Sequence, residues 1–253
     1  MLNCNLIPIS GSGTNSSTLW IAGAVTLGFT AFARIIRGVS RSGAAAGALV
    51  CFVLIAGAGL GAFGGLIAVF ALTWAATRFG YRRKQALGIA ERPEGREASQ
   101  VGANLGVAAG CCVLYWFSHG NSVFLAAIVA ALAEAAADTV SSELGQAANR
   151  QARLITSWEL VPAGTNGGIS AIGTLSGIAA AALVASICVL ARLLPWRYFP
   201  HCLGGAVAGM FLDSLLGASL ERQGRIGNHA VNFLSTLMAA ILASGSVLLL
   251  SVN

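Results

Sequence analysis

Three carboxylates lie in and just beyond an apolar stretch that begins near residue 122: Glu134, Asp138 and Glu143. An ionisable residue within or at the edge of a membrane span is costly, so it marks a candidate functional site. Glu134 and Asp138 are four residues apart and therefore share one face of a helix. A fourth carboxylate, Asp213, occurs near the end of another apolar stretch. The spacing thus predicts an acidic site shared by two membrane helices.

Carboxylates at helix C-termini are disfavoured by the helix dipole and by one another, so two such helices side by side need a cation. Mg²⁺ is the natural candidate, because it binds one or two carboxylates together with substrate phosphates. We expect Asp138, Glu143 and Asp213 to bind this metal and act in catalysis, with Glu134 as a supporting ligand. The alternative for the two aspartates is a structural salt bridge to a loop arginine.

The elements that position these residues follow from composition. The chain has 253 residues, of which 56% are hydrophobic and 9% charged, whereas a soluble domain carries roughly 25% charged residues. The prediction is an all-α polytopic membrane protein, with residues 1–17 as a polar N-terminal segment and 18–253 as one transmembrane helical domain. The predicted spans are 18–34, 43–57, 60–77, 101–118, 122–138, 169–191, 201–219 and 230–250. The second is short and Gly-rich, so seven spans remain an alternative to eight.

Charge distribution predicts the orientation of these spans. If the connection around Arg37 is cytoplasmic and the spans alternate, every basic residue except Arg192 and Arg197 is cytoplasmic, as the positive-inside rule requires. The net charge of +6 is then explained by topology and does not indicate nucleic-acid binding. All the acids also fall at the cytoplasmic side or its membrane edge. We therefore expect a multi-pass inner-membrane protein whose active site faces the cytoplasm.

A glycine-rich segment, 161–170, leads directly into the sixth span. Glycines let the backbone approach a ligand closely, and the N-terminus of the following helix attracts anions. This predicts a phosphate-binding loop, although an ordinary glycine turn is the alternative. No Gly-Lys-Ser/Thr follows, so the segment is not a Walker A motif. The residues expected to bind phosphate here are Gly164, Thr165, Gly167, Gly168 and Ser170.

Other polar residues occur at the same predicted depth. Arginine forks suit phosphate oxygens, so Arg78, Arg82 and Arg96 are expected to bind phosphate, and Lys84 to act in catalysis. Attraction to anionic lipid headgroups is an alternative for Arg82 and Lys84. Asparagines that open two spans could instead hydrogen-bond between helices. The remaining candidates for substrate binding are Asn104, Thr139, Ser142, Ser214 and Asn232.

Several of these motifs resemble a known family. The chain is similar, over roughly residues 40 to 250, to the uncharacterised-domain integral membrane family that includes the plant and cyanobacterial phytyl-phosphate kinases of the vitamin E pathway. The resemblance implies phosphoryl transfer from a nucleoside triphosphate, CTP or UTP in preference to ATP, to an isoprenyl monophosphate. The matching motifs are Thr77-Arg78-x-x-Tyr81-x-x-Lys84, Gly95-Arg96 with Asn104, Ala137-Asp138-Thr139-x-Ser141-Ser142-Glu143-x-Gly145, Val161-Pro162-x-Gly164-Thr165-x-Gly167-Gly168-x-Ser170, Asp213-Ser214-x-x-Gly217-Ala218 and Asn232.

Other functions remain open from the residues alone. A cytidylyltransferase that makes a CDP-activated lipid needs the same parts. A lipid or small-solute transporter suits the 32 glycines, but its charged site is usually near the bilayer midplane, where we expect no acid. A phosphatase using His229 lacks a second cytoplasmic histidine. The sequence sets neither the isoprenoid chain length nor the oligomeric state; the expected partners are the isoprenyl monophosphate and membrane lipids.

Overall fold

The computed structural model describes residues 16–148 and 151–252, so most of the predicted polar N-terminal segment lies outside the described residues. Within the described residues, eight helices are long and apolar enough to cross a membrane, which confirms the predicted class. The second, α2, is one continuous helix of 18 residues, so the alternative of seven spans was wrong. The helices are α1 (Ser16–Ile35), α2 (Arg41–Ala58), α3 (Leu60–Arg78), α4 (Tyr81–Ala86), α5 (Ala98–Phe117), α6 (Ser122–Ala148), α7 (Ala171–Leu190), α8 (Phe199–Leu216) and α9 (Asn228–Val252).

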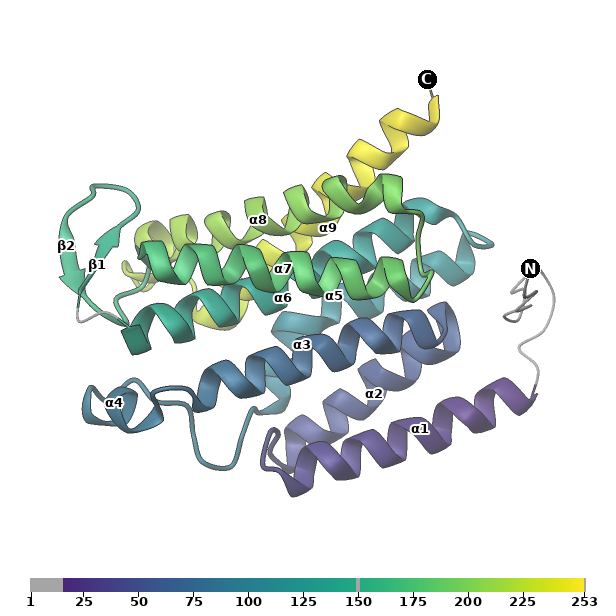
Figure 1. Cartoon of the computed structure of the whole chain (residues 1–253), viewed down its shortest axis with the longest axis horizontal. Helices are drawn as coiled ribbons and strands as arrows, with labels where there is room; N and C mark the ends of the chain where they lie inside the picture. The colour runs from purple at the N-terminus through teal and green to yellow at the C-terminus, as the bar shows by residue number, and fades with distance from the viewer. Residues whose placement is uncertain (1–15, 149–150, 253) are drawn as a thin grey trace.

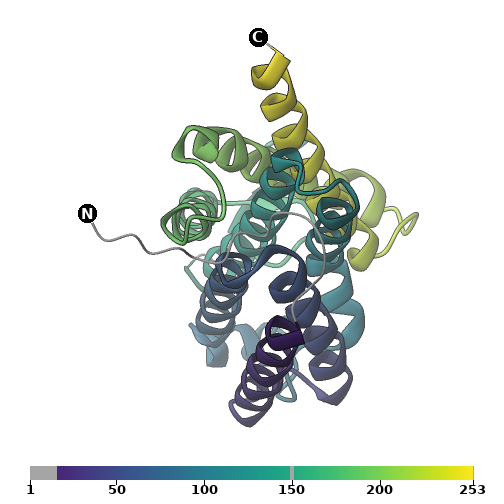
Figure 2. The same ribbon diagram turned by 90° about the vertical axis from the view of Figure 1, so that its right-hand side faces the viewer.

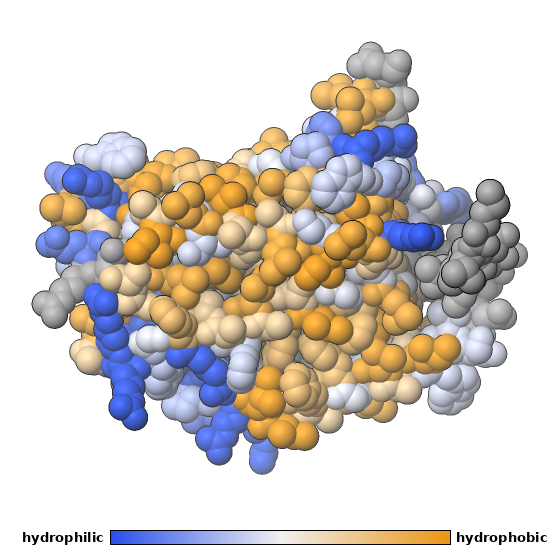
Figure 3. All heavy atoms as spheres, in the orientation of Figure 1, coloured by the Kyte–Doolittle hydropathy of each residue, from blue (hydrophilic) through white to orange (hydrophobic). Residues whose placement is uncertain are grey.

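Consecutive spans run in alternating directions (Figures 1 and 2). Only Gly59 separates α2 from α3, and its φ of +79° is a conformation that favours glycine. The short helix α4 and the β-strands gather at one end of the bundle, on the left in Figure 1. We call this the polar end; it comprises residues 36–40, 79–97, 151–170 and 217–227. Figure 3 shows apolar side chains over the middle of one face and hydrophilic ones near its ends, as expected of a bundle in lipid.

The central element is α6, which packs against α3, α5, α7, α8 and α9. Its alanines, such as Ala130 and Ala136, are fully buried, and small residues of this kind let membrane helices approach closely. The helix continues to Ala148 instead of ending near residue 138 as predicted. Half of residues 139–148 are weak helix formers, such as Thr139 and Val140, so this part of the helix depends on packing against α7, where Gly145 lies next to Gly173. Asp138 therefore lies inside α6, and Glu134 lies about halfway along it. That no acid lies near the bilayer midplane stays a prediction, and Glu134 is the acid closest to the middle of α6.

A three-stranded antiparallel sheet with the order β2-β1-β3 caps the polar end. Its strands are β1 (Gln151–Leu154), β2 (Leu160–Pro162) and β3 (Gly168–Ile169), and β1 lies in the middle, pairing Arg153 with Leu160 and Leu154 with Gly168. The elements predicted from the sequence were all helices, so this sheet was not expected. Strands this short carry no readable alternation of apolar and polar residues. Two further short helical turns flank α8. A π-turn at Gly217–Glu221 follows this helix at the polar end, and a 3₁₀ turn at Trp196–Tyr198 precedes it at the opposite end.

Candidate functional site

Asp138 of α6 and Asp213 of α8 bring their carboxyl groups into hydrogen-bonding contact. The hydroxyl of Ser235, on α9, donates to Asp213 Oδ2 at 3.4 Å. Two carboxylates in contact repel one another unless a proton or a cation lies between them. The structure thus brings together two aspartates that are 75 positions apart in the numbering. Their role as metal ligands stays a prediction.

Glu134 lies one helical turn before Asp138 and is only 1% exposed. It interacts electrostatically with both aspartates. Close approach of α8 requires a glycine here, since a Cβ on Gly209 would lie 2.7 Å from Glu134 Cγ. The Oε1 atom of Glu134 is buried and has no hydrogen-bond partner among the described residues. A buried oxygen without a partner is costly, so these residues fit a bound cation.

An all-oxygen set of this kind suits Mg²⁺, which needs only one or two carboxylates when substrate phosphates and water complete its shell. Among the described residues, no group of three or more His, Cys, Asp or Glu side chains is arranged to hold a metal on its own. Asp138 and Asp213 would therefore be the direct ligands. Glu134 would supply negative charge from one turn deeper in the bundle.

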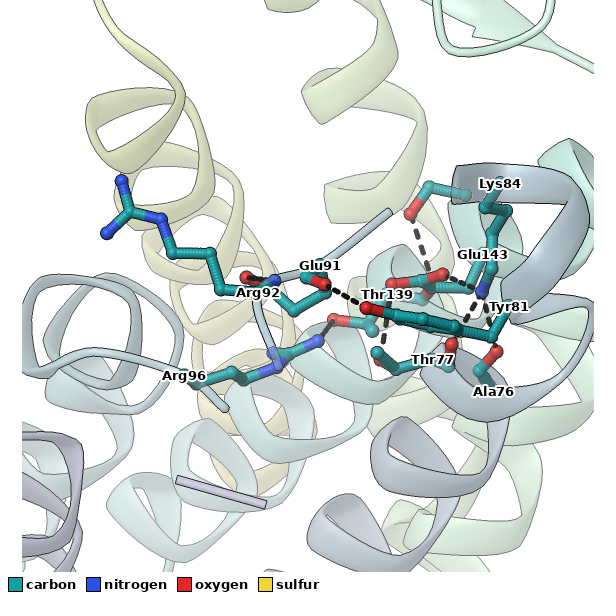
Figure 4. A network of polar contacts seen from close by, with 10 residues as sticks. Ala76, Thr77, Tyr81, Lys84, Glu91, Arg92, Arg96, Thr139 and Glu143 are labelled. Atoms are coloured by element: carbon teal, nitrogen blue, oxygen red, sulfur yellow. Dashed lines mark hydrogen bonds and ion pairs between the residues drawn. The ribbon is translucent and has the colours of Figure 1, made fainter. Parts of the chain in front are cut away.

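Glu143 does not join the aspartate pair. It forms an ion pair with Lys84 of α4 and accepts a hydrogen bond from Thr77 Oγ1 at 3.1 Å (Figure 4). Five residues separate Glu143 from Asp138, which rotates it about 140° around α6, whereas Glu134 is rotated by about 40°. The helical period therefore carries Glu143 away from Asp213. The geometry does not support the prediction that Glu143 is a metal ligand.

Lys84 is fully buried, and its Nζ also donates to the carbonyl oxygens of Ala76 at 3.1 Å and Thr77 at 2.8 Å. These carbonyls belong to the last turn of α3, where a cation offsets the helix dipole. Lys84 thus joins α3, α4 and α6. It lines neither of the two cavities described below, so its contacts are structural, and the predicted catalytic role has no geometric support.

A polar cavity of about 170 Å³ opens beside the aspartate pair. It contains Asp138 and Asp213 together with the entire glycine loop, defined here as residues 163–170. Nine of the predicted site residues meet in it: Asp138, Ser142, Gly164, Thr165, Gly167, Gly168, Ser170, Asp213 and Ser214. The structure therefore assembles at one place the carboxylates and the glycine motif, which lie on separate parts of the chain.

The glycine loop is held by both the sheet and α7. The amide of Ile155 donates to Gly167 O at 3.0 Å, next to strand β3. The Ser170 side chain caps α7 by accepting from the amide of Gly173 at 3.1 Å, so the positive end of this 20-residue helix is at the cavity. Gly164 and Gly167 have φ values of +86° and +77°. These contacts give the loop a fixed shape with its backbone against the cavity.

Gly167 is the closest contact in this loop, because a Cβ there would lie 2.4 Å from Ala218 N. Gly167→Ala is expected to lower the unfolding midpoint of the detergent-solubilised protein and to reduce ligand binding in the polar cavity. Gly224→Ala is the matched control, since Gly224 also has a positive φ of +69° but no atom within 4 Å of an added Cβ. In both variants an alanine must adopt a left-handed backbone conformation, which costs about 1–2 kcal/mol. Only Gly167→Ala also displaces the glycine loop. Equal midpoints for the two variants would contradict this account.

The remaining hydroxyl and amide residues are divided between the cavity and the helix contacts. Asn232 Nδ2 of α9 donates to Asn104 Oδ1 of α5 at 3.3 Å, which is the helix–helix hydrogen bond that the sequence left as an alternative. Thr139 Oγ1 faces Arg96 and accepts from its Nη2 at 3.3 Å. Ser142 and Ser214 line the polar cavity. Asn232 and Thr139 do not line it.

The three predicted phosphate-binding arginines lie in different surroundings. Arg96 points at Thr139, next to Asp138, and its charge acts on that carboxylate (Figure 4). Arg78 donates to Ile36 O at 2.7 Å and stacks over Trp74 at 4.6 Å. Arg82 is exposed on α4 and lines neither cavity. Of the three predicted phosphate-binding arginines, Arg96 is therefore the one beside the aspartate pair.

Sequence reasoning missed four residues around the polar cavity. They are the polar residues Ser141, Gln146, Glu221 and Asn228, all of which line it. Glu221 ends the π-turn that follows α8, and such turns occur frequently at functional sites. The polar residues that follow Leu216-Gly217, such as Ser219 and Glu221, could have indicated that this segment belongs to the site. The π-turn itself could not be read from the sequence.

The chain was compared with known proteins. The family model described as integral membrane protein DUF92 matches residues 24–240. Protein VTE6, chloroplastic, of Arabidopsis thaliana is 30% identical over 83% of this chain and 65% of the plant protein. An uncharacterized membrane protein of Synechocystis is 32% identical over 71% of each chain. One of Methanocaldococcus jannaschii is 39% identical over 45% of this chain and 48% of its own length.

The chain thus spans just under two thirds of the plant relative and about half of the archaeal one. No solved structure gives a significant match. The match to the family model includes the aspartate pair, the glycine loop and Arg96, and its span agrees with the resemblance noted from the motifs. On the extent of that match, the chain belongs to the DUF92 family of integral membrane proteins.

Proposed function

We propose that this protein transfers a phosphoryl group from a nucleoside triphosphate to an isoprenyl monophosphate, giving the diphosphate. The observation that carries the proposal is the polar cavity in which Asp138 and Asp213 face the glycine loop. Phosphoryl transfer needs mainly positioning and neutralisation of charge, and these parts supply both. The similarity to Protein VTE6 and the motifs of the phytyl-phosphate kinases support the choice of an isoprenyl acceptor.

In this proposal Asp138 and Asp213 would hold Mg²⁺, which would neutralise charge on the donor phosphates. The backbone of the glycine loop and the N-terminus of α7 bind the donor phosphates, and CTP or UTP is the expected donor. Arg96 orients the acceptor phosphate. An oxygen of that phosphate attacks the terminal phosphorus of the donor, and the bond from phosphorus to the bridging oxygen breaks. The nucleoside diphosphate leaves with the electron pair, and no base is needed because the attacking phosphate is already ionised.

The proposal includes an orientation, with the polar end at the cytoplasmic face of an inner membrane. It is supported by the basic residues of the polar end, such as Arg83, Arg96 and Arg153, which follow the positive-inside rule. Among the described residues, the Arg and Lys side chains of the opposite end are Arg192 and Arg197. Nucleotides would then reach the cavity from the cytoplasm and the lipid from the adjoining leaflet.

Product analysis tests the proposal. Purified protein in detergent is incubated with Mg²⁺, geranylgeranyl or phytyl monophosphate and each nucleoside triphosphate in turn, and both products are identified by mass. We expect isoprenyl diphosphate and nucleoside diphosphate in equal amounts, with the most from CTP or UTP. A nucleotidyl-lipid with pyrophosphate would instead establish cytidylyl transfer. No turnover with any donor would overturn the enzymatic proposal and favour a transporter, for which the mid-helix position of Glu134 would then be relevant.

A further inference from the structure

A second cavity, of about 390 Å³, lies among α1, α2, α3 and α5. Its volume falls within the range of roughly 300–1,000 Å³ that is typical of small-molecule sites. Its walls in the membrane-spanning part are mostly apolar and include Phe29, Leu66, Val69, Phe70 and Leu105, with Thr30, Thr73 and Asn104 as polar members. We call it the apolar cavity. None of the residues that line the polar cavity is among those that line this one.

The apolar cavity is strongly basic where it reaches the polar end. Four arginines line it there, against a single carboxylate, Glu91: Arg37, Arg78, Arg92 and Arg96. Arg92 is paired with Glu97, and Arg78 is engaged with Trp74 and Ile36. Among the described residues the Arg37 side chain forms no hydrogen bond or ion pair, and its backbone has a φ of +56°. One end of the cavity therefore suits an anion and the other a hydrocarbon.

Arg96 is fixed at the boundary between the two cavities. Its backbone N–H donates to Gly38 O at 3.2 Å, and its carbonyl accepts from the amide of Ser40 at 3.0 Å. Gly43 allows this close contact, since a Cβ there would lie 2.0 Å from Arg96 O. The guanidinium lines the apolar cavity and donates to Thr139 on α6. Asp138, the residue directly before Thr139, lines the polar cavity.

We infer that the apolar cavity binds a phosphate monoester with a single hydrocarbon chain. The phosphate lies at Arg37 and Arg96, and the chain extends between α1, α2, α3 and α5. This inference deepens the proposed function by assigning separate sites to the acceptor and the donor. Only the transfer between the two sites rests on the proposed function; binding of the lipid phosphate does not. Arg96 is then a positioning residue between the two phosphates.

The size of the cavity argues for one chain. A cavity of roughly 150 Å³ holds benzene, so by proportion about 390 Å³ holds roughly 15 non-hydrogen atoms. A phosphate takes five of these, which leaves room for about ten carbons of one chain. A longer tail would extend into the membrane, and two chains side by side would not fit.

Gly47 gives a direct test, because it lines the apolar cavity and a Cβ there meets no atom within 4 Å. Gly47→Phe is expected to weaken the binding of geranylgeranyl monophosphate tenfold or more, since the ring occupies the space of the chain. Binding is measured without nucleotide, by native mass spectrometry of the detergent-solubilised protein. Gly102→Phe is the matched control, because Gly102 is exposed on α5, also has open space around its Cβ and does not line the cavity.

Two further ligands distinguish the sources of a lipid phosphate. Dodecyl monophosphate should bind and lose affinity in Gly47→Phe, as geranylgeranyl monophosphate does, whereas phosphatidic acid should bind at least tenfold more weakly to the wild type. Equal affinity for phosphatidic acid would overturn the single-chain assignment. Unchanged binding of both single-chain ligands in Gly47→Phe would overturn the cavity assignment.

Arg37→Gln provides a second variant should Gly47→Phe fail to fold. It should weaken the binding of geranylgeranyl monophosphate several-fold without changing that of geranylgeraniol, which lacks the phosphate. Arg41→Gln is its control, since Arg41 is exposed and lines neither cavity. Equal loss for the phosphate and the alcohol would overturn the phosphate assignment. If the lipid binds as expected but no nucleotide supports turnover, the cavity assignment holds and the kinase proposal fails. If the protein turns over the lipid but neither variant changes its binding, the kinase proposal holds and the cavity assignment fails.

Discussion

Asp138→Asn is expected to reduce turnover of the isoprenyl monophosphate by about 1,000-fold or more, equivalent to about 4 kcal/mol. The substitution keeps the shape of the side chain and removes one of the two carboxyl groups that meet between α6 and α8. The protein should remain folded, because the change also removes the repulsion between Asp138 and Asp213. Turnover is measured by the product assay, and folding by size-exclusion profile and unfolding midpoint in detergent.

A second measurement separates metal binding from catalysis. Mg²⁺ should raise the unfolding midpoint of the wild type, because a ligand that binds only the folded protein stabilises it. It should raise that of Asp138→Asn much less. Glu94→Gln is the matched control, since Glu94 is exposed at the polar end and lines neither cavity. Wild-type turnover in a folded Asp138→Asn protein, or an equal response to Mg²⁺, would show that the aspartate pair is not the metal site.

Lys84→Met is expected to destabilise the protein by about 3–5 kcal/mol, the usual cost of leaving one member of a buried ion pair without its partner. Methionine replaces the stem of the side chain but leaves Glu143 and the carbonyls of Ala76 and Thr77 without their donor. The variant should therefore lose stability, while the molecules that remain folded keep their turnover. The measurement is the unfolding midpoint in detergent, combined with the turnover of the fraction that remains folded.

The double variant Lys84→Met, Glu143→Gln tests the cause. Replacing both partners of a buried pair costs much less than removing one, so the second change should recover much of the lost stability. Turnover per folded molecule should then approach that of the wild type. A double variant that is stable but inactive would instead return Lys84 to the catalytic role that its sequence motif suggested.

The aspartate pair lies where the helices of the bundle pack closely. Asp138 belongs to the most buried helix of the bundle, and α7 and α8 approach it through glycines, with a Cβ on Gly177 lying 2.8 Å from Ala137 O. The side chains of the site therefore rest on rigid elements, while the glycine loop closes over them from the sheet. Rigid support of this kind favours precise placement of charge around a phosphate.

Much of the framework could be predicted from the sequence. Apolar stretches of about 20 residues can satisfy their backbone in lipid only as helices, so eight spans follow from composition. The four-residue spacing of Glu134 and Asp138 puts them on one helical face. Alternation of the spans brings the ends of α6 and α8 to the same end of the bundle as the glycine loop. These features depend on length and helical period, both of which are local properties of the chain.

Other features were decided only by the tertiary structure. Nothing in the motifs indicates that Glu143 pairs with Lys84 or that an apolar cavity adjoins Arg96. A hydrogen bond between helices was an alternative for the asparagines, but only the structure shows that Asn104 and Asn232 are each other's partners. The helical period fixes the angle between side chains on one helix, but the rotation of each helix about its axis is set by packing against its neighbours. Here that packing depends on many small contacts between alanines and glycines, each weak and unspecific by itself. The sequence by itself therefore determined which residues reach the polar end, and only the assembled bundle decided which of them meet.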